Sequence, residues 1–194
     1  MRIRRPGQLR QACGDAARWP EDKKVAVNVS ATQLAGGKLA ATVLSALAES
    51  GLPPSRLEIE ITETVLMQST EEALSTLRQL HDVGVRIAMD DFGIGYSSLS
   101  YLRNFPFDTI KIDRSFVKGL TEDGDCGAIV RAITNLARSL AMTTTAEGVE
   151  TEQQRQKLRD LGCTEMQGFL FSWPQPIAEI ARLFLSQAQT ANAA

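Results

Sequence analysis

The chain has 194 residues, of which 43% are hydrophobic and 23% are charged, with 21 basic residues against 23 acidic ones. This composition is typical of one globular domain and excludes collagen-like or disordered sequence. A formal net charge of -2 gives no reason to expect duplex nucleic acid as a partner. No segment approaches the roughly 18 apolar residues of a membrane span, and no signal-peptide core is present. We therefore expect either a cytoplasmic protein or the cytosolic part of a longer protein.

Cysteine and histidine content excludes several kinds of site. Cys13, Cys126 and Cys163 are odd in number and form no Cys-x-x-Cys pair, so the sequence indicates neither a disulfide framework nor a structural zinc site. We expect three reduced, partly buried thiols. The single histidine, His81, stands near a predicted helix end and is expected to be partly exposed, which leaves a serine or cysteine nucleophile without a placed base.

From Lys24 onward, short β-branched segments alternate with stretches whose apolar residues recur at helical spacing. This alternation is typical of βα units around a parallel sheet. Strands are expected at residues 25–30, 57–62, 85–91, 109–113, 143–147 and 163–168. The sequence therefore predicts an α/β chain with a single domain over residues 1–194, in which the Ala-rich residues 188–194 form a disordered tail.

Residues typical of helix ends stand between these strands. The segments 69–72 and 151–154 each predict a capping box, in which Ser69 and Thr151 are the expected N-cap residues. Gly84 is expected to end the first of these helices in the left-handed conformation. Asp125 is expected to cap a further helix, whose buried stripe includes Ile129.

A polar residue recurs near the carboxyl end of each expected strand. Successive side chains of a strand point to opposite faces, so these residues share the side away from the β-branched residues. They are Asn28, Glu60, Asp90, Lys111, Glu147 and Gln167. In a closed parallel barrel this side is the interior, and the carboxyl ends form the mouth where active sites lie. The alternative, an amphipathic sheet with one wet face, agrees poorly with a parallel sheet that helices cover on both faces.

The acidic members of this set predict a metal site. Several carboxylates that converge without a cation would repel one another. Glu60, Asp90, Asp91 and Glu147 together would form a hard, oxygen-rich site that suits Mg²⁺ or Mn²⁺. The adjacent pair Asp90 and Asp91 would let one carboxylate bridge two ions.

Six short motifs, taken together and in order, resemble those of the EAL family of cyclic-di-GMP phosphodiesterases over roughly residues 9–185. They are NVS at 28–30, EITE at 60–63, DDFGIGYSSLSYL at 90–102, KIDRSF at 111–116, AEGVET at 146–151 and QGFLFSWP at 167–174. The resemblance implies a TIM-type (β/α) barrel, incomplete here because about six of eight βα units are present. It also implies hydrolysis of cyclic di-GMP to linear pGpG with two Mg²⁺ or Mn²⁺ ions.

The resemblance assigns metal ligands to this sequence. Asn28, Glu60 and Asp90 are similar to the ligands of a first ion, and Asp90 and Asp91 to those of a second. Asp113 corresponds to a residue beside the second ion. No covalent intermediate is implied, since two ions can activate water and stabilise an in-line displacement.

Further roles follow from the same resemblance. Lys111 is similar to the lysine that orients the attacking water, and Glu147 to the general base or a metal ligand. Gln167 corresponds to a polar support. Glu63 corresponds to the residue that steadies the loop after Asp91, a segment that couples dimerisation to activity in relatives.

Three departures from the family pattern accompany these matches. The Glu-Ala-Leu motif that names the family stands near the N-terminus of its members, and we expect this tripeptide to be absent from the chain. The corresponding segment would hold two strands, a metal-ligating glutamate and a phosphate-binding arginine. Ile94 stands where the family usually has threonine. We therefore expect a longer natural protein, with a missing N-terminal segment or a sensor domain, or a chain that forms a homodimer or higher oligomer.

Competing functions remain open at this point. The retained acidic set favours a cyclic-di-GMP phosphodiesterase. The missing motif favours a catalytically impaired module that binds cyclic di-GMP or a protein partner. Another metal-dependent barrel enzyme is the third alternative, against which the order of the motifs argues.

Overall fold

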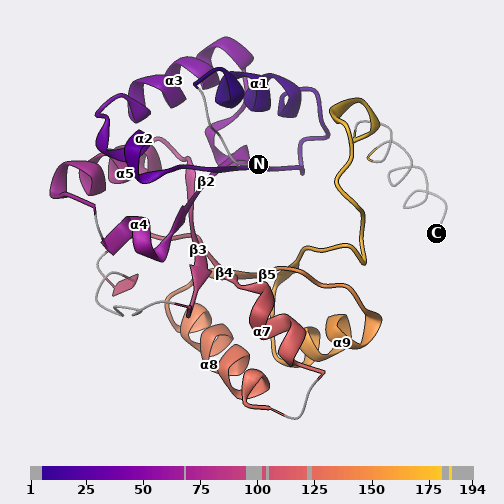
Figure 1. The fold of residues 1–194 in the computed structure, drawn as a ribbon. Coiled ribbons are helices and arrows are strands. Elements are labelled where there is room, and N and C mark those ends of the chain that lie inside the picture. The colour runs from indigo at the N-terminus through magenta and orange to yellow at the C-terminus, as the bar shows by residue number, and fades with distance from the viewer. Residues whose placement is uncertain are drawn as a thin grey trace.

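The structure is a computed structural model that describes residues 6–67, 69–94, 102–103, 105–121, 124–180 and 184. In this part of the chain, six strands form one sheet in which every neighbouring pair is parallel and the strand order follows the sequence. The strands are β1 (Val25–Asn28), β2 (Leu57–Thr62), β3 (Arg86–Phe92), β4 (Thr109–Ile112), β5 (Thr143–Ala146) and β6 (Glu165–Met166). The sheet curls into a half-barrel (Figure 1). The predicted incomplete parallel barrel is confirmed, although β6 is shorter than expected.

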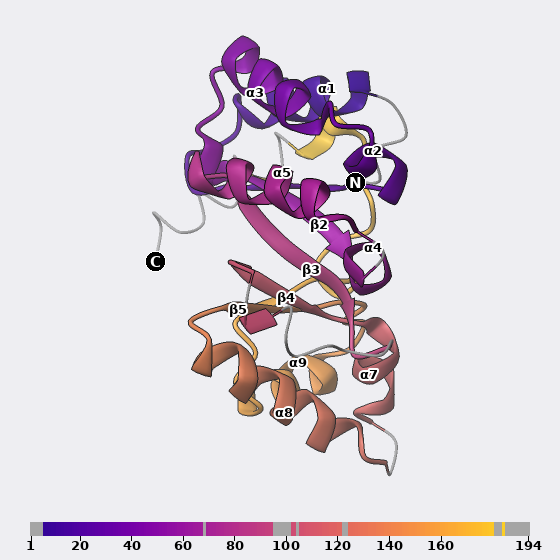
Figure 2. The same cartoon turned by 90° about the vertical axis from the view of Figure 1, so that its left-hand side faces the viewer.

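Helices cover the outer side of the curl. Figure 2 shows α1, α2, α3 and α5 beside the first half of the sheet and α7, α8 and α9 beside the second half. Their bounds are α1 (Pro6–Ala16), α2 (Ala31–Ala35), α3 (Leu39–Ser50), η1 (Pro54–Arg56), α4 (Glu63–Met67), α5 (Glu71–Asp82), α7 (Arg114–Gly119), α8 (Cys126–Ser139) and α9 (Glu152–Asp160). Among the described residues, no helix is long and apolar enough to cross a bilayer.

The hydrophobic core lies between the sheet and these helices. The isoleucines of β2 and β4, Ile59, Ile61, Ile110 and Ile112, are fully buried there. Because side chains alternate along a strand, the residues between these isoleucines point to the opposite, concave side of the sheet. This alternation delivers the polar side chains of the strands to the barrel interior.

Helix ends follow the sequence expectations in part. Thr151 forms the predicted capping box with Gln154, and Gly84 has the predicted left-handed conformation, with φ of 94°. The prediction that Ser69 caps α5 is wrong, because Thr70 is the N-cap and its side chain accepts from Ala73 N. The Ser69 hydroxyl instead donates to Val65 O, within the last turn before α5.

Two further expectations about α8 are wrong. Asp125 stands at the N-cap position but makes no side-chain cap hydrogen bond, since its ψ of -1° is helical and turns its side chain away from the first N–H groups. Ile129 is 38% exposed and lies outside the buried stripe of α8. The residues 188–194 that we expected to be disordered lie outside the described part of the chain.

A polar network at the amino ends of the strands stabilises the inside of the half-barrel. Arg86 of β3 contacts Glu58 at 3.4 Å and Asp108 at 3.6 Å, and donates to the Thr109 hydroxyl at 3.3 Å. The Thr109 hydroxyl in turn donates to Glu58 at 3.0 Å. This amino-end network connects β2, β3 and β4 on the side of the sheet opposite the isoleucine core.

Candidate functional site

The ammonium group of Lys111 lies at the centre of a cluster of carboxylates near the carboxyl ends of the strands. Lys111 Nζ is 2.6 Å from Glu60 Oε1, 3.2 Å from Asp90 Oδ1 and 2.5 Å from Glu147 Oε1. These acids come from β2, from β3 and from the residue after β5, respectively. We call Glu60, Asp90, Lys111 and Glu147 the Lys111 cluster. The parallel sheet creates it, because the carboxyl ends of parallel strands meet at one edge.

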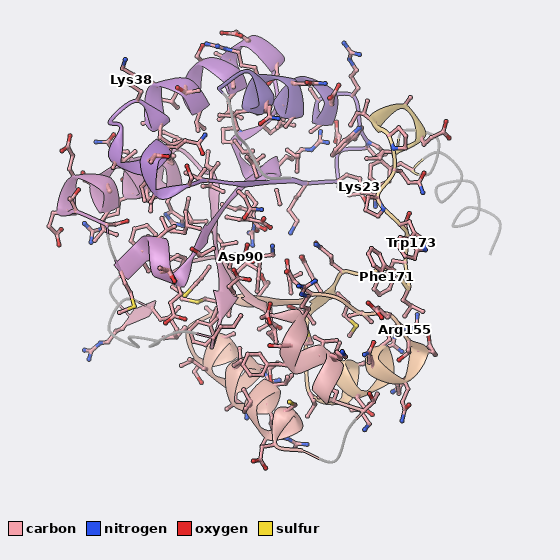
Figure 3. All side chains as sticks on the ribbon, in the orientation of Figure 1. Lys23, Lys38, Asp90, Arg155, Phe171 and Trp173 are labelled. Carbon is pink, nitrogen blue, oxygen red and sulfur yellow. The ribbon has the colours of Figure 1, made fainter. Side chains whose placement is uncertain are left out.

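The Lys111 cluster is shielded from solvent. Glu60 and Lys111 are each 4% exposed and Asp90 is 7% exposed. Asn28 of β1 donates from Nδ2 to Glu60 Oε2 at 2.6 Å, so both carboxylate oxygens of Glu60 have partners. The sheet register pairs Asn28 with Glu60, which explains this contact between neighbouring strands. Figure 3 shows Asp90 on β3, within the curl of the sheet.

An irregularity in β3 places the two adjacent aspartates. Met89 pairs with Ile110 and Phe92 with Ile112, so Asp90 and Asp91 together stand opposite a single residue of β4. Asp91 has a φ of 56°, a left-handed conformation that is uncommon outside glycine. Its N–H donates to Asp90 Oδ1 at 3.2 Å. Such bulges occur next to active sites, where they redirect side chains.

Glu63 and Asp91 line one cavity, and Asp91 directly follows Asp90 of the Lys111 cluster. A cavity of about 230 Å³ is lined by Thr62, Glu63, Thr64, Asp91 and Ile94. Glu63 is the first residue of α4 and is buried, whereas Ile94 is exposed. Glu63 and Ile94 thus share a cavity wall with Asp91, and the role of Glu63 in steadying the loop after Asp91 stays a prediction. Gly95, part of the motif 90–102, lies outside the described residues.

Two predicted site residues lie apart from the Lys111 cluster. Asp113 is the N-cap of α7, and its Oδ1 accepts from Ser115 N at 2.8 Å. Gln167 is exposed and lines a different cavity, of about 360 Å³, with Phe169 and Trp173 among its walls. In the part of the chain that the structure describes, neither side chain shares a hydrogen bond or ion pair with the cluster.

Burial and charge act together on the cluster. Burial lowers the pKa of the Lys111 ammonium, but the carboxylates of Glu60, Asp90 and Glu147 outweigh burial and raise this pKa above its ordinary value. Burial also raises the pKa of Glu60, an effect that the attraction of Lys111 reduces and the charge of Asp90 reinforces. Lys111 is therefore charged at neutral pH, and it offsets only part of the acidic charge around it.

The donor chemistry of the site suits a hard divalent cation, but the spacing of the donors is set by the ammonium. Carboxylate and amide oxygens are the groups that bind Mg²⁺ and Mn²⁺. Nevertheless, the described residues include no group of three or more His, Cys, Asp or Glu side chains arranged around a metal-sized position. The carboxylates of Glu60, Asp90 and Glu147 surround Lys111 Nζ instead.

Sequence reasoning missed the two features that shape this site. It gave Lys111 no ionic role at the centre of the carboxylates, because spacing along a strand does not say which side chains touch. It also treated Asp90 and Asp91 as ordinary neighbours in a strand, and so missed the bulge. Gly93, with φ of 94°, is the local signal that β3 ends irregularly.

The sequence of this chain matches a known protein family. The family model described as "EAL domain" matches residues 8–174. The chain belongs to the EAL domain family. The predicted resemblance is thus confirmed, and the Lys111 cluster lies on segments within the matched residues.

Two similar proteins, one of them compared in both sequence and structure, illustrate the relationship within the EAL family. MucR of Pseudomonas aeruginosa, a bifunctional diguanylate cyclase/cyclic di-GMP phosphodiesterase, is 44% identical over 176 residues, which is 89% of this chain and 26% of MucR. The structure of a c-di-GMP complex of the PaMucR phosphodiesterase has a TM-score of 0.86 at 43% identity, covering 90% of this chain and 72% of that one. A manganese and cyclic-di-GMP complex of Klebsiella pneumoniae BlrP1 has a TM-score of 0.75 at 35% identity, covering 87% and 44% respectively.

The chain spans only a small part of its curated relatives. It covers 22%, 21% and 23% of the length of three of them, including an uncharacterized protein of Sinorhizobium fredii that is 46% identical over 185 residues.

The expectation that the tripeptide Glu-Ala-Leu is absent is wrong, because it occurs in this sequence at residues 72–74, outside the Lys111 cluster. Glu72, Ala73 and Leu74 lie in the first turn of α5. Ala73 and Leu74 are buried in the core, and Glu72 is exposed on the outer side of the sheet. This tripeptide is therefore a helix segment outside the Lys111 cluster.

Proposed function

We propose that the chain is a cyclic-di-GMP phosphodiesterase domain that hydrolyses cyclic di-GMP to linear pGpG. The observation that carries this proposal is the convergence of the buried Glu60 and Asp90 and the half-buried Glu147 on Lys111 in an EAL domain. Relatives with cyclic di-GMP bound support the choice of substrate. The excess of carboxylates over ammonium groups supports a cation-dependent reaction.

Residues of this chain would hold two divalent cations, either Mg²⁺ or Mn²⁺. Asn28, Glu60 and Asp90 would bind the first ion, and Asp90 and Asp91 the second, with Asp113 close to it. The manganese complex of BlrP1 and its calcium counterpart support the use of a divalent cation by the family. When bound, such ions supply an acidified water and stabilise negative charge on the phosphoryl oxygens.

The remaining side chains would move protons and position the reacting groups. The oxygen of water adds to phosphorus and the bond to the 3′ oxygen of the ribose breaks. The leaving 3′ oxygen takes a proton from solvent, so the ring opens to a 5′-phosphate and a free 3′-hydroxyl. Glu147 would accept the proton of the attacking water. Lys111, which contacts Glu147 at 2.5 Å, would hold that water in line and offset phosphoryl charge. Gln167 would be a polar support at the mouth, and Glu63 would steady the segment after Asp91.

The test is a product assay on the purified chain. Cyclic di-GMP with Mn²⁺ is expected to give pGpG, detected by chromatography, and Glu147→Gln is expected to reduce the rate by about 10²-fold or more. Glu150→Gln is the matched control, because Glu150 lies three residues further along and is exposed. Product that forms equally well with Glu147→Gln would contradict the proposed role of Glu147. No product from wild type at millimolar Mn²⁺ would contradict catalysis by this chain alone.

A second candidate is a noncatalytic module that binds cyclic di-GMP or a protein partner. The spacing of the donors favours it, because the carboxylates are gathered around an ammonium and not around a metal-sized position. Calorimetric titration of cyclic di-GMP into the chain distinguishes the two candidates. Heat of binding without formation of pGpG would favour the module.

The wider context of the domain belongs to the same proposal. Residues 1–194 would be a single, partial EAL domain that works in the cytoplasm, as a homodimer or with a further N-terminal segment or sensor domain. Size-exclusion chromatography with light scattering tests the dimer. The short coverage of the curated relatives supports the expectation of further segments.

A further inference from the structure

The Lys111 ammonium occupies the position around which the acidic side chains of the proposed metal site are gathered. Glu60, Asp90 and Glu147 each place an oxygen within 3.2 Å of Nζ, and the described residues include no group of three or more His, Cys, Asp or Glu side chains arranged around a metal-sized position instead. We propose that Lys111 is an internal stand-in cation, which keeps the site assembled without metal and which divalent ions must displace. The inference rests on the metal site of the proposed function.

Charge explains why the site needs such a cation. The carboxylates come from separate strands, and Glu60 and Asp90 are almost completely buried. Carboxylates held together in a buried pocket repel one another, and a buried charge without a partner is strongly destabilising. One ammonium that contacts all three acids reduces that repulsion. Without Lys111, the ends of β2, β3 and the segment after β5 would be driven apart.

The same contacts make Lys111 a competitor of metal. A divalent ion bound by Glu60 and Asp90 would compete with Nζ for the negative charge of these carboxylates, and it would repel the ammonium at close range. Metal binding therefore requires Lys111 to leave Glu60 and Asp90. Lys111 Nζ also contacts Glu147 Oε1 at 2.5 Å. Metal ions bound by Glu60 and Asp90 would leave this contact intact. When metal ions replace it at Glu60 and Asp90, Lys111 would contact only Glu147, the proposed base.

The test compares wild type with Lys111→Met, a variant of similar length without the charge. Mn²⁺ binding is measured from the electron paramagnetic resonance signal of free Mn²⁺, and melting temperature is measured in EDTA and in saturating Mn²⁺. We expect Lys111→Met to bind Mn²⁺ about tenfold more tightly or better, because a competing positive charge is gone. We also expect it to melt several degrees below wild type in EDTA, with the difference shrinking or reversing in Mn²⁺.

Arg86→Met is the matched control. Arg86 is the cation of the amino-end network, where it contacts Glu58 and Asp108 inside the same half-barrel. Its removal is expected to lower the melting temperature equally with and without Mn²⁺ and to leave Mn²⁺ affinity unchanged. This control separates displacement by metal from the general cost of losing a buried cation.

A second measurement keeps the inference falsifiable if Lys111→Met does not fold. In wild type with ¹⁵N-labelled lysine, the Lys111 ammonium should give a protected signal in EDTA, absent from Lys111→Arg, that shifts saturably on addition of Mg²⁺. Equal or weaker Mn²⁺ binding by Lys111→Met, a stability deficit that Mn²⁺ leaves unchanged, or an ammonium signal insensitive to saturating Mg²⁺ would each overturn the inference. None of these readouts involves cyclic di-GMP, so a chain without phosphodiesterase activity can still pass or fail this test.

Discussion

Gly168 follows the predicted site residue Gln167 and lies against the backbone of Val149. An ideal Cβ at Gly168 would overlap Val149 N and O, and it would lie 2.7 Å from the Val149 carbonyl carbon. Backbone atoms cannot rotate away as a flexible side chain can, so an added methyl group must move one segment relative to the other. The movement would disturb two hydrogen bonds, from Val149 N to Gln167 O at 3.1 Å and from Leu170 N to Val149 O at 3.0 Å.

Gly168→Ala is therefore expected to lower the free energy of unfolding by about 3 kcal/mol, from roughly 1–3 kcal/mol of overpacking and about 0.5 kcal/mol for each of the two weakened hydrogen bonds. For a chain of this length, that loss corresponds to a melting temperature roughly 6–12 °C lower. Because Val149 stands two residues after Glu147, the same shift should displace the proposed base and reduce pGpG formation.

The assay is urea unfolding followed by circular dichroism, with Gly127→Ala as the matched control. Gly127 lies in the first turn of α8, and a Cβ there meets no heavy atom within 4 Å. Gly127→Ala is expected to be neutral or to raise the free energy of unfolding by up to about 1 kcal/mol. If the two alanine variants unfold at the same urea concentration, the steric reasoning about Gly168 is refuted.

Three shorter predictions test other parts of the structure. Arg56 is buried and donates to Lys23 O, Ala16 O and Pro20 O at 2.8–3.0 Å. Arg56→Met should therefore lower the free energy of unfolding in urea by roughly 2–3 kcal/mol, and a decrease under about 0.5 kcal/mol would contradict a stabilising role of these hydrogen bonds. Burial raises the pKa of the Cys13 thiol to about 11. At pH 8, iodoacetamide should therefore label the partly exposed Cys126 well before Cys13, as followed by mass spectrometry, and equal labelling rates would refute the burial of Cys13. At Asp91, whose φ is 56°, Asp91→Gly should cost less stability than Asp91→Val by about 1–2 kcal/mol, and equal melting temperatures would argue against the left-handed backbone.

The strands and their order were predictable from the sequence because each strand carries its own signal. In β2 and β4, β-branched residues alternate with polar ones, and this period of two is set by the pleat of a single strand. The N-cap of α5 was not predictable in the same way. Ser69 and Thr70 are adjacent hydroxyl residues with equal local suitability, and the path of the chain after α4 decides that Thr70 takes the cap.

The candidate site was predictable only as far as strand periodicity reaches. Glu60, Asp90 and Lys111 share a face because they stand near the ends of neighbouring parallel strands, which is what the sequence indicated. Asp113 and Gln167 follow their strands, where the backbone leaves the pleat and the alternation no longer controls side-chain direction. Asp113 consequently caps α7, and the exposed Gln167 faces another cavity.

The two polar networks inside the half-barrel show why one end of the strands is the functional end. At the amino end, Arg86 pairs with Glu58 and Asp108, and Asp108 also accepts from the N–H of Ile87 at 2.8 Å, so that network closes on the backbone and ties the strands together. At the carboxyl end, one ammonium serves three carboxylates. A network that only stabilised the fold would gain from fewer acids there, since each buried carboxylate costs desolvation energy. The surplus of negative charge beside Lys111 is therefore best explained by cations that arrive from solution.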